Sequence, residues 1–354
     1  MSKRIIALLL ALVMVFALCA CGNDGNGGNS AGTEDVGDET YTIRIACENS
    51  DSYPATLGLY QMEKYVESHT NGKVQVEVCA SGQLGGEEET LEQVAQGNLE
   101  MAVASFAPVV SYVPEFEVMD IPFVYNSYTE AWMVLDSYVG TNLLDKMEAQ
   151  GLKGMAYMEN GMRQVTSNVS AINSIADFKG VKLRTMQNNN HMASFSALGA
   201  NPTPVAFSEL YISLSQKVVD AQENPIANVT DKKLYEVQKY LSLTNHIYDA
   251  MPLVCNLEFF NSLPQAYQKV VQAGAIYAQE FSRFCNLERE DLILADLADK
   301  YGMQINEVSA DARAEMAKVA QPAVIKLVAK DIGQDAVDQY MNDVKDVLAQ
   351  ISKF

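Results

Sequence analysis

The feature of this chain that most limits its fold is the alternation of strand-like and helix-like segments between Tyr41 and Ser105. In chain order these segments are residues 41–46 (strand), 54–68 (helix), 73–79 (strand), a helix that opens with Glu87, and 99–105 (strand). Strands that are connected through a helix usually pair in parallel, because the helix returns the chain to the edge from which the first strand started. The pattern therefore predicts an α/β fold with parallel strands and crossover helices.

A similar alternation resumes after Gly151 and predicts a second α/β unit. Its expected elements are extended segments at 155–158 and 164–167, a short helical turn at 174–180, a strand at 181–185 and a helix at 189–198. Ser208 is a good N-cap residue for a further helix, in which apolar residues recur at 210, 214 and 218. Two domains of moderate size also suit a chain of 354 residues.

A polar segment, QENP at residues 222–225, follows that helix directly. Pro225 restricts the backbone of Asn224 to an extended conformation, so we expect the Asn224 amide to lie on a fixed loop. Arg163 and Arg184 lie upstream in strand-like surroundings. A guanidinium group stays charged and can donate two parallel hydrogen bonds to a carboxylate. Together these residues predict a pocket for a small organic anion.

The net charge limits the kinds of partner that the chain can bind. It has 25 Lys and Arg residues against 45 Asp and Glu residues, which gives a formal charge of −20. Binding to a phosphate backbone needs a basic surface, so this balance argues against nucleic acid as a partner.

Sequence patterns typical of catalysis are missing from the chain. It contains no G-x-S-x-G, H-E-x-x-H or G-x-x-x-x-G-K-[ST] motif, and no G-x-G-x-x-G that opens a helix after a strand. Its three histidines, His69, His191 and His246, leave little for a catalytic triad or a metal site. We therefore expect no enzyme activity, no metal and no cofactor, and we place His69 at the end of a surface helix.

The N-terminus predicts export. Two basic residues precede an apolar run of 14 residues, 5–18, which is shorter than the roughly 20 residues of a membrane-spanning helix and is typical of a signal peptide. Residues 18–22 (LCACG) resemble the bacterial lipobox, in which a small residue precedes a cysteine that becomes lipidated. We expect this cysteine to be Cys21, with Cys19 as the less favoured register and an ordinary secretory signal as the other alternative.

These features define the expected organisation of the N-terminal region. Residues 1–20 form the signal peptide, and residues 21–40 form a flexible tether. The tether has almost no apolar side chains and cannot bury enough surface to offset the entropy of ordering it. The protein is therefore expected to be lipid-anchored at the outer face of the cytoplasmic membrane.

Four cysteines follow the lipobox, and their spacing matches no CxxC metal or redox motif: Cys47, Cys79, Cys255 and Cys285. Cys47 and Cys79 fall at the ends of two predicted strands, which could place them side by side. A disulfide between them and a pair of plain buried thiols are both open, and we favour the thiols.

Six segments of the chain occur in an order that is characteristic of one protein family. They are SGQLGGEEE, PEFEVMDIPF, NGMRQVTS, ADFKGVKLR, LGANPTPVAFSELYISLSQKVVDAQENP and YEVQKYLSLTNH. This pattern closely resembles the substrate-binding proteins of tripartite ATP-independent periplasmic (TRAP) transporters, of the dicarboxylate-binding, DctP-like type. The resemblance extends over about residues 41–289 and weakens in the C-terminal helices.

The resemblance implies a two-domain α/β clamp of the periplasmic-binding-protein type, similar to type II. The ligand cleft lies between the domains, and a long C-terminal helix spans the hinge around which they close. Domain I would comprise residues 41–160 and 250–288. Domain II would comprise residues 161–249, with residues 289–354 contributing helices that pack across both domains.

The resemblance also implies the ligand-binding residues. Arg184, at the end of DFKGVKLR, corresponds to the family's central carboxylate-binding arginine, although without the motif a structural ion pair would be the favoured role. Arg163 corresponds to a second ligand-contacting arginine and Asn224 to an amide ligand. Phe207 corresponds to an aromatic wall against the ligand, with core packing equally open, and Gln187 to a polar lining position.

Departures from the family pattern bear on the choice of ligand. Ala221 replaces the usual glycine before QENP. The positions that contact the ligand in sialic-acid-binding members hold Glu48, Ser105 and Pro108, so sialic acid is not expected. Glu48 and Glu87 are placed to reach the hydroxyls of a polyol acid, which slightly favours a uronate or other sugar acid over a bare C4 dicarboxylate. A solvated or helix-capping carboxylate is the alternative for each.

The expected function is the capture of an organic anion by a monomeric extracytoplasmic lipoprotein. The resemblance implies delivery to a permease with a small and a large integral subunit, driven by an ion gradient. It also implies a structural hydrogen bond for His246, which lies in the TNH motif. Two alternatives stay open: a receptor that presents its ligand to a sensor kinase, and a surface enzyme that acts on sugar acids through Glu48 or Glu87.

Overall fold

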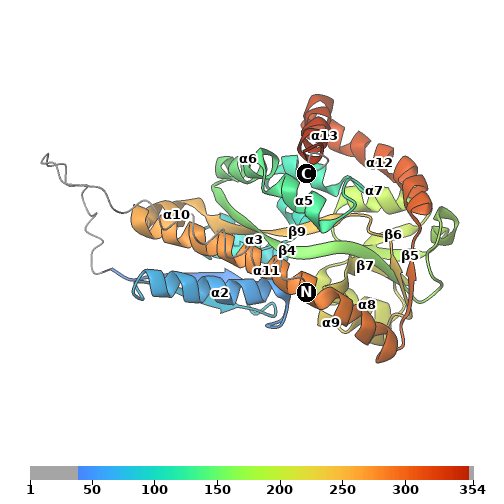
Figure 1. Ribbon diagram of the computed structural model, residues 1–354, viewed down its shortest axis with the longest axis horizontal. Coiled ribbons are helices and arrows are strands. Elements are labelled where there is room, and N and C mark those ends of the chain that lie inside the picture. The colour runs from blue at the N-terminus through green and yellow to red at the C-terminus, as the bar shows by residue number, and fades with distance from the viewer. Residues whose placement is uncertain (1–38, 351–354) are drawn as a thin grey trace, which may run out of the picture. The chain divides into compact units, whose positions relative to one another are not determined.

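The computed structural model describes residues 39–350 (Figure 1). The expected signal peptide at 1–20, the expected lipidation site Cys21 and all but the last two residues of the tether at 21–40 lie outside the described residues. Within residues 39–350, none of the helices combines the length and the apolar character that crossing a membrane requires.

Strands and helices alternate along the described chain. The strands are β1 (Tyr41–Ala46), β2 (Val74–Cys79), β3 (Met101–Val103), β4 (Leu152–Ser167), β5 (Lys182–Thr185), β6 (Asn201–Pro204), β7 (Ala221–Pro225), β8 (Tyr240–Leu243), β9 (Tyr248–Asn256) and β10 (Gln304–Glu307). The α-helices are α2 (Pro54–His69), α3 (Glu87–Ala95), α4 (Phe106–Val109), α5 (Tyr128–Leu135), α6 (Tyr138–Lys146), α7 (Asn189–Ala197), α8 (Leu210–Ser215), α9 (Ile226–Asp231), α10 (Leu257–Ser262), α11 (Gln265–Asp299), α12 (Ala310–Ile332) and α13 (Gln334–Leu348). Short 3₁₀ helices are η2 (Pro114–Asp120), η3 (Met147–Gln150), η4 (Ile175–Phe178), η5 (Phe207–Glu209) and η6 (Leu234–Glu236).

The strands follow the order β2-β1-β3-β9-β4-β7-β5-β6, and β8 pairs with both β4 and β10. β1 pairs in parallel with β2 and β3, which confirms the pairing predicted for the first unit. β5 pairs in parallel with β6 and β7. We call β2, β1 and β3 the first strand group, and β7, β5 and β6 the second. The antiparallel pair formed by β4 and β9 connects the two groups.

β4 is a single strand of 16 residues, whereas the sequence predicts two separate extended segments at 155–158 and 164–167. The prediction fails because the intervening residues, Glu159 to Gly161, are polar and end in glycine, as a turn would. In the structure these residues are buried, and the register of pairing with β9 shifts between them. Gly161 has a φ of 127°, a conformation that side chains disfavour, so the strand passes this point as a bulge.

Two local predictions after residue 200 are wrong. Ser208 lies inside η5 and makes no capping bond, and α8 ends before Val218, which is exposed. Asn224 lies in β7, paired with β4, and not on a loop. The extended backbone that Pro225 imposes suits a strand equally well, and Pro225 is the last residue of β7.

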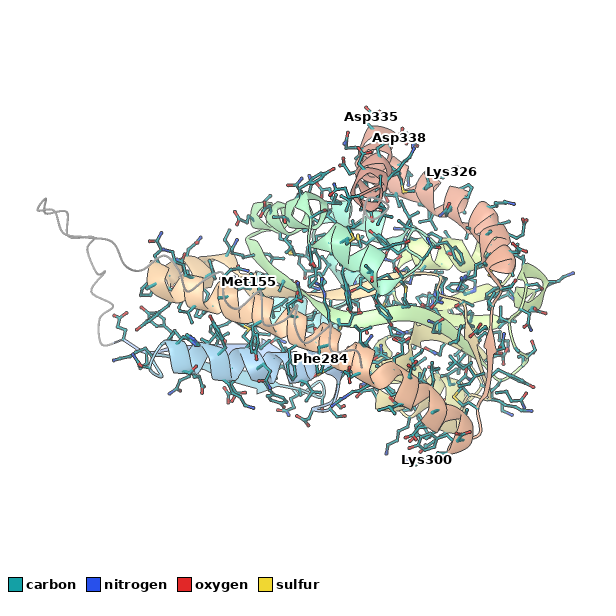
Figure 2. The ribbon with its side chains drawn as sticks, viewed as in Figure 1. Met155, Phe284, Lys300, Lys326, Asp335 and Asp338 are labelled. Carbon is teal, nitrogen blue, oxygen red and sulfur yellow. The ribbon has the colours of Figure 1, made fainter. Side chains whose placement is uncertain are left out.

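The long helix α11 runs alongside α2 (Figure 1). The close approach of the two helices requires glycine at position 58 of α2, since a Cβ atom there would lie 2.5 Å from the backbone oxygen of Ala278. α11 then continues to α9, where Leu297 is buried in a cluster with residues of α8, α9 and β8. The spanning helix that the resemblance implies is therefore present. Its outer side carries exposed apolar side chains such as Phe284 (Figure 2).

The last two long helices pack on elements from different parts of the chain. α12 contacts α7, η2 and α13, and α13 contacts α5 and α6. Asp120 of η2 is itself joined to the start of α7, because its Oδ2 atom accepts hydrogen bonds from Asn188 at 2.8 Å and Asn190 at 3.1 Å. Hydrogen bonds and helix packing thus connect segments of the fold that are distant in sequence.

The backbones of Cys47 and Cys79 lie side by side, as the strand prediction implied. The amide of Cys47 donates to the carbonyl oxygen of Cys79 at 3.0 Å. The thiols are free; that of Cys47 is buried and that of Cys79 is partly exposed. The favoured interpretation, that the two residues are unlinked, is confirmed.

Candidate functional site

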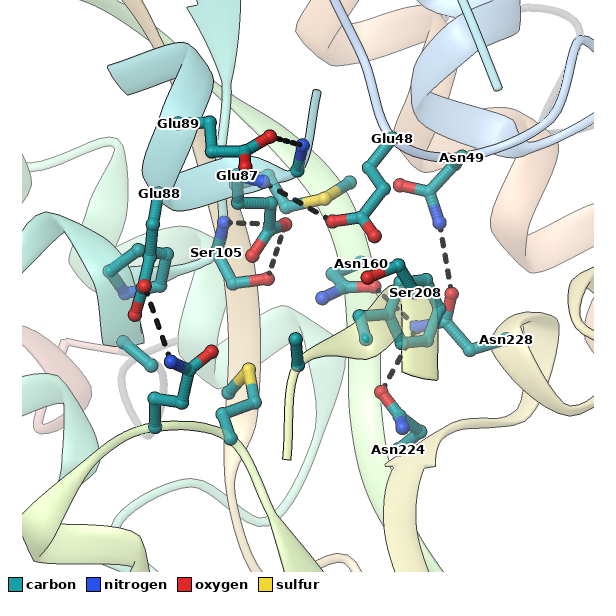
Figure 3. A pocket seen from close by; sticks show the side chains of 18 of the residues that line it. Glu48, Asn49, Glu87, Glu88, Glu89, Ser105, Asn160, Ser208, Asn224 and Asn228 are labelled. Carbon is teal, nitrogen blue, oxygen red and sulfur yellow. Dashed lines mark hydrogen bonds between the residues drawn. The ribbon is translucent and has the colours of Figure 1, made fainter. Parts of the chain in front are cut away.

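A cavity of about 290 Å³ lies between the two strand groups (Figure 3). Its walls include residues that directly follow β1, β3 and β5, so it lies at the carboxyl ends of parallel strands. Loops that leave strands in this direction are the usual source of ligand-binding residues in α/β proteins. Six of the seven predicted ligand residues line the cavity: Arg184, Asn224, Phe207, Gln187, Glu87 and Glu48.

Arg184 is an almost fully buried cation that forms no ion pair with a carboxylate of residues 39–350. It lies in β5 with 1% of its surface exposed, and its Nε–H donates to the carbonyl oxygen of Val205 at 2.8 Å. Its Nη1 atom has no hydrogen-bond partner within residues 39–350. No ion pair joins Arg184 to any described carboxylate either, which contradicts the structural ion pair considered as an alternative.

Burial is the main influence on the Arg184 guanidinium. It lowers the pKa of Arg184 to about 10, and the neighbouring charge of Arg163 lowers it further, while Glu223, Glu48 and Glu87 act in the opposite direction. Burying a charge without a partner is costly, so this arrangement is stabilised when an anion enters the cavity.

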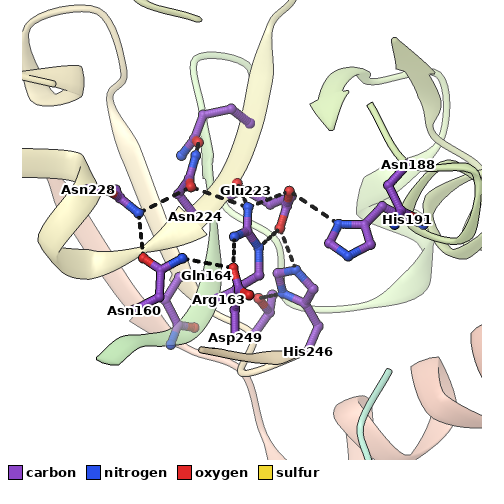
Figure 4. A network of polar contacts seen from close by, with 12 residues as sticks. Asn160, Arg163, Gln164, Asn188, His191, Glu223, Asn224, Asn228, His246 and Asp249 are labelled. Atoms are coloured by element: carbon purple, nitrogen blue, oxygen red, sulfur yellow. Dashed lines mark hydrogen bonds and ion pairs between the residues drawn. The ribbon is translucent and has the colours of Figure 1, made fainter. Parts of the chain in front are cut away.

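Arg163 does not line the cavity, although the resemblance implies a ligand contact. The side chain is fully buried and forms two bonds to the Glu223 carboxylate, from Nε at 2.5 Å and from Nη2 at 2.8 Å (Figure 4). Nη1 donates to Asp249 at 2.7 Å. Burial alone lowers the pKa of Arg163, but these two carboxylates outweigh it and raise the pKa. The structure therefore places Arg163 in an internal ion-pair network behind the cavity wall.

Glu223 is the centre of that network. Its Oε2 atom also lies 3.1 Å from Nε2 of His246, and its Oε1 atom lies 3.8 Å from Nδ1 of His191 (Figure 4). Burial raises the pKa of Glu223, but the charge of Arg163 and the histidine contacts lower it well below its usual range. His246 also contacts Thr244 Oγ1 at 2.8 Å, so the structural hydrogen bond expected of His246 is confirmed.

The network holds the Asn224 amide in one orientation. The Oδ1 atom of Asn224 accepts from Nη2 of Arg163 at 3.2 Å, and its Nδ2 atom donates to Gln222 at 2.6 Å. Because Arg163 can only donate, the oxygen of the amide must face it. Arg163 thus reaches the cavity indirectly, through a lining residue that it positions.

Three amide side chains that line the cavity are linked to one another by hydrogen bonds. Asn49, which follows β1, donates to Asn228 of α9 at 3.0 Å, and Asn228 donates to Asn160 of β4 at 3.0 Å (Figure 3). Asn160 in turn donates to Asp249 at 2.8 Å and accepts from the hydroxyl of Tyr53 at 2.5 Å. These bonds join the two strand groups directly around the cavity.

Two carboxyl groups, Glu87 and Glu48, face the same cavity from the first strand group. Oε1 of Glu87 accepts from both the backbone N–H and the hydroxyl of Ser105, at 3.0 and 2.9 Å. Oε2 of Glu48 accepts from the backbone N–H of Glu87 at 3.3 Å, at the start of α3. Burial, and then the charge of Glu48, raise the pKa of Glu87 to about 8, and burial also raises the pKa of Glu48.

Phe207 and Gln187 complete the predicted set. Phe207 lines the cavity while it also packs against a buried cluster of the second half, and the ammonium group of Lys232 lies 4.6 Å from its ring centre. Gln187, which follows β5, donates to Glu88 of α3 at 3.3 Å, which is a further direct bond between the two sides of the cavity. Both interpretations of Phe207 therefore describe part of its surroundings.

Comparison with known proteins places this arrangement in a family. Residues 45–331 match the bacterial extracellular solute-binding proteins, family 7 (DctP). The chain belongs to this family. The sugar acid binding protein DctPAm of Advenella mimigardefordensis, solved in complex with galactonate, is 32% identical with a TM-score of 0.83, and the match covers 87% of this chain and 99% of that one.

Two further relatives show the same relationship. A TRAP periplasmic solute-binding protein of Polaromonas sp. JS666, bound to D-erythronate, is 34% identical with a TM-score of 0.80, covering 85% of this chain and 98% of that one. The C4-dicarboxylate-binding periplasmic protein DctP of Rhodobacter capsulatus is 31% identical over 84% of this chain and 90% of that protein. The fold is therefore the two-domain clamp of TRAP periplasmic binding proteins, which are transport components and not enzymes.

The cavity residues that sequence reasoning missed include three asparagines: Asn49, Asn160 and Asn228. Signals for them existed. Asn49 follows Glu48 at the end of a predicted strand, and Asn228 follows the predicted ligand residue Asn224 by four positions and donates to it at 3.4 Å. Asn160 sits between the two extended segments that the sequence predicts, which concealed its position on a strand.

Replacing Glu87 with glutamine is expected to flatten the pH dependence of stability in the ligand-free solute-binding protein. The pKa of Glu87 is raised from 4.5 to about 8, so the folded state holds a proton that the unfolded state releases in this interval. Its contribution is fully present below about pH 4.5 and is lost as the pH rises through about 8, an effect on the order of a few kcal/mol. Urea denaturation between pH 5 and about 8.5 measures the difference between parent and variant.

Glutamine keeps the oxygen that accepts from Ser105, so folding itself should survive. Glu92→Gln is the matched control, because Glu92 is exposed on the same helix and bonds to Gln96. The control should shift stability by a constant amount at every pH. A parallel pair of curves for the parent and Glu87→Gln would contradict the assignment of a bound proton to Glu87.

Proposed function

We propose that this protein is an extracytoplasmic lipoprotein that captures a carboxylate-containing organic acid and delivers it to a TRAP-type permease. It is anchored through Cys21 at the outer face of the cytoplasmic membrane and acts as a monomer. Its permease has a small and a large integral subunit and uses an ion gradient. The ligand is a sugar acid such as a uronate, or a C4 dicarboxylate.

One observation carries the proposal: Arg184 is buried at the wall of the cavity with Nη1 unpaired among the described residues. A planar fork of donors suits a carboxylate, which accepts two parallel hydrogen bonds. Asn224 adds a fixed amide on the same side of the cavity. The volume of about 290 Å³ lies near the lower end of the roughly 300–1,000 Å³ of typical small-molecule sites, so the ligand is small.

The ligands of similar proteins support an organic acid. DctPAm was solved with galactonate, the Polaromonas protein with D-erythronate, and a Sulfurospirillum deleyianum protein, 31% identical to this chain, with succinate. Each of these molecules has at least one carboxylate. Each of them therefore carries the group that Arg184 is proposed to bind.

The proposed domains are residues 41–160 with 250–288, and residues 161–249 with 289–354. The boundary at 160 coincides with the bulge at Gly161 in β4. The boundary after residue 288 falls inside α11, so this helix would span both domains. Opening of the clamp would separate the groups joined by Asn49–Asn228 and Glu88–Gln187.

A panel of acids tests the proposal. The mature chain is mixed with uronates, aldonates, C4 dicarboxylates and keto acids, and its unfolding is followed with and without each compound. An acid at about 100 times its Kd should raise the free energy of unfolding by about 2.7 kcal/mol. Galactose serves as the control for galacturonate, because it has the same ring without the carboxylate. If no acid in the panel stabilises the protein, the proposed function is wrong.

A further inference from the structure

The lining of the cavity is uneven in charge. Four glutamates line it from the first strand group, Glu48 and residues 87–89, and Figure 3 shows them on the side away from Asn224. Arg184 is the one cation among the described lining residues. Lys232 lies nearby, but it contacts the backbone oxygen of Glu48 and the ring of Phe207 and is outside the lining.

We infer that the cavity selects polyhydroxy monocarboxylates, with the carboxylate at Arg184 and hydroxyls at Glu48 and Glu87, and rejects dicarboxylates of the same length. This inference rests on the proposed function, since it names which of the two ligand classes the same site takes. It assigns the choice to two acidic side chains that offer acceptor oxygens to the ligand hydroxyls.

The hydrogen bonds of the two glutamates leave acceptors for a ligand. Ser105 occupies only Oε1 of Glu87, and the backbone of α3 occupies only Oε2 of Glu48. Within residues 39–350 no group donates a hydrogen bond to the other oxygen of either side chain. A ligand hydroxyl can donate to these oxygens, whereas an ionised carboxylate has no hydrogen to donate.

The charges decide against a second carboxylate. One guanidinium balances one ligand carboxylate, and a second would meet the acidic side of the cavity, Glu48 and residues 87–89, without a cation from the described lining. Like charges brought together in a binding site disfavour the wrong partner strongly. Burial, and then the charge of Glu48, raise the pKa of Glu87 to about 8, so this side of the cavity already disfavours a further negative charge.

The test compares acids that differ only in one end group. Galactonate, gluconate and erythronate are each paired with the dicarboxylate of the same chain: galactarate, glucarate and meso-tartrate. Calorimetry of the mature chain at neutral pH measures each Kd. We expect the tightest-binding monocarboxylate to bind at least about 100-fold more tightly than its dicarboxylate counterpart.

Glutamine variants test which residues are responsible. Glu48→Gln and Glu87→Gln keep the size of the side chains and replace each carboxyl group with a neutral amide. In the double variant the preference for the monocarboxylate should fall at least about 10-fold, mainly through tighter binding of the dicarboxylate. Glu92→Gln on the same helix should leave the preference unchanged. An unchanged preference in both single variants and the double variant would overturn the assignment to Glu48 and Glu87.

The possible failures are distinguishable. Tighter or equal binding of a dicarboxylate by the parent chain overturns this inference but leaves the proposed function intact. Failure of every acid to bind contradicts both. The comparison within the parent chain does not depend on variants, so it stands even if the double variant fails to fold.

Discussion

Replacement of Arg184 with alanine is expected to weaken organic-acid binding by at least about 100-fold, and replacement with lysine nearly as much. Removing one member of a desolvated charge pair typically costs 2–5 kcal/mol or more, and each tenfold loss of affinity corresponds to about 1.4 kcal/mol. Lysine keeps the charge but offers a point-like ammonium in place of two parallel donors. Calorimetry with the acid that binds most tightly to the parent chain measures the loss.

The same substitutions separate binding from stability. Without ligand, Nη1 of Arg184 is buried with no partner in the described chain, so the guanidinium is costly to the folded state. Arg184→Met, which fills similar volume without charge, should unfold at a higher urea concentration than the parent. Loss of the bond to Val205 offsets only part of this gain. Such a result would be an example of the common trade-off in which a residue needed for binding lowers the stability of the fold.

Arg313→Ala is the matched control. Arg313 lies on α12 and is not part of the cavity, and its replacement removes the same charge as Arg184→Ala. The Arg313→Ala variant should bind each acid with the same affinity as the parent chain. Retained affinity in Arg184→Ala would remove Arg184 from the site, and a large loss of stability in Arg184→Met would show that the side chain is structural.

Replacement of Glu223 with glutamine is expected to destabilise the fold by about 3–5 kcal/mol. The substitution leaves Arg163 buried with Asp249 as its remaining anion, at 2.7 Å, and removes the negative charge that faces His246. Because proteins are stable by only about 5–15 kcal/mol, this is a large part of the total. The midpoint of urea denaturation, measured without ligand, reports the effect.

A double-mutant cycle makes this second prediction specific. Arg163→Met alone should be costly for the corresponding reason, but Arg163→Met with Glu223→Met should cost less than the sum, because no unpaired charge of this pair is left. Glu115→Gln is the surface control. Its partner Lys146 lies at 3.1 Å but both side chains are exposed, so the expected cost is below about 1 kcal/mol. Additive costs for Arg163 and Glu223 would contradict a coupled buried pair.

The sequence allowed the fold, and several residues that line the candidate site, to be predicted, because the necessary signals are local. The alternation in residues 41–105 predicts the parallel strands around β1, and the DFKGVKLR segment predicts the place of Arg184. Six of the seven predicted ligand residues line one cavity. Patterns of this kind depend on neighbours in the chain, which a single sequence displays.

The remainder could not be predicted, because it depends on contacts between distant segments. Arg163 resembles a ligand-binding arginine, but its role is decided by Glu223 and Asp249, which lie 60 and 86 residues away in sequence. β4 was divided in two because the polar residues around Asn160 have the composition of a turn. Only the burial of those residues against the rest of the fold shows that they continue a strand.

The amide bonds that cross the cavity have a consequence for how long a ligand stays. Asn49–Asn228 and Glu88–Gln187 connect the two strand groups without using any ligand atom. Departure of a ligand requires these contacts to break together with its own, so they lengthen the residence time without adding to recognition. Three of the four side chains are neutral amides, which salt screens far less than it screens charged pairs. Release on a useful timescale then depends on a partner that pulls the two groups apart, a role that the proposed function gives to the permease.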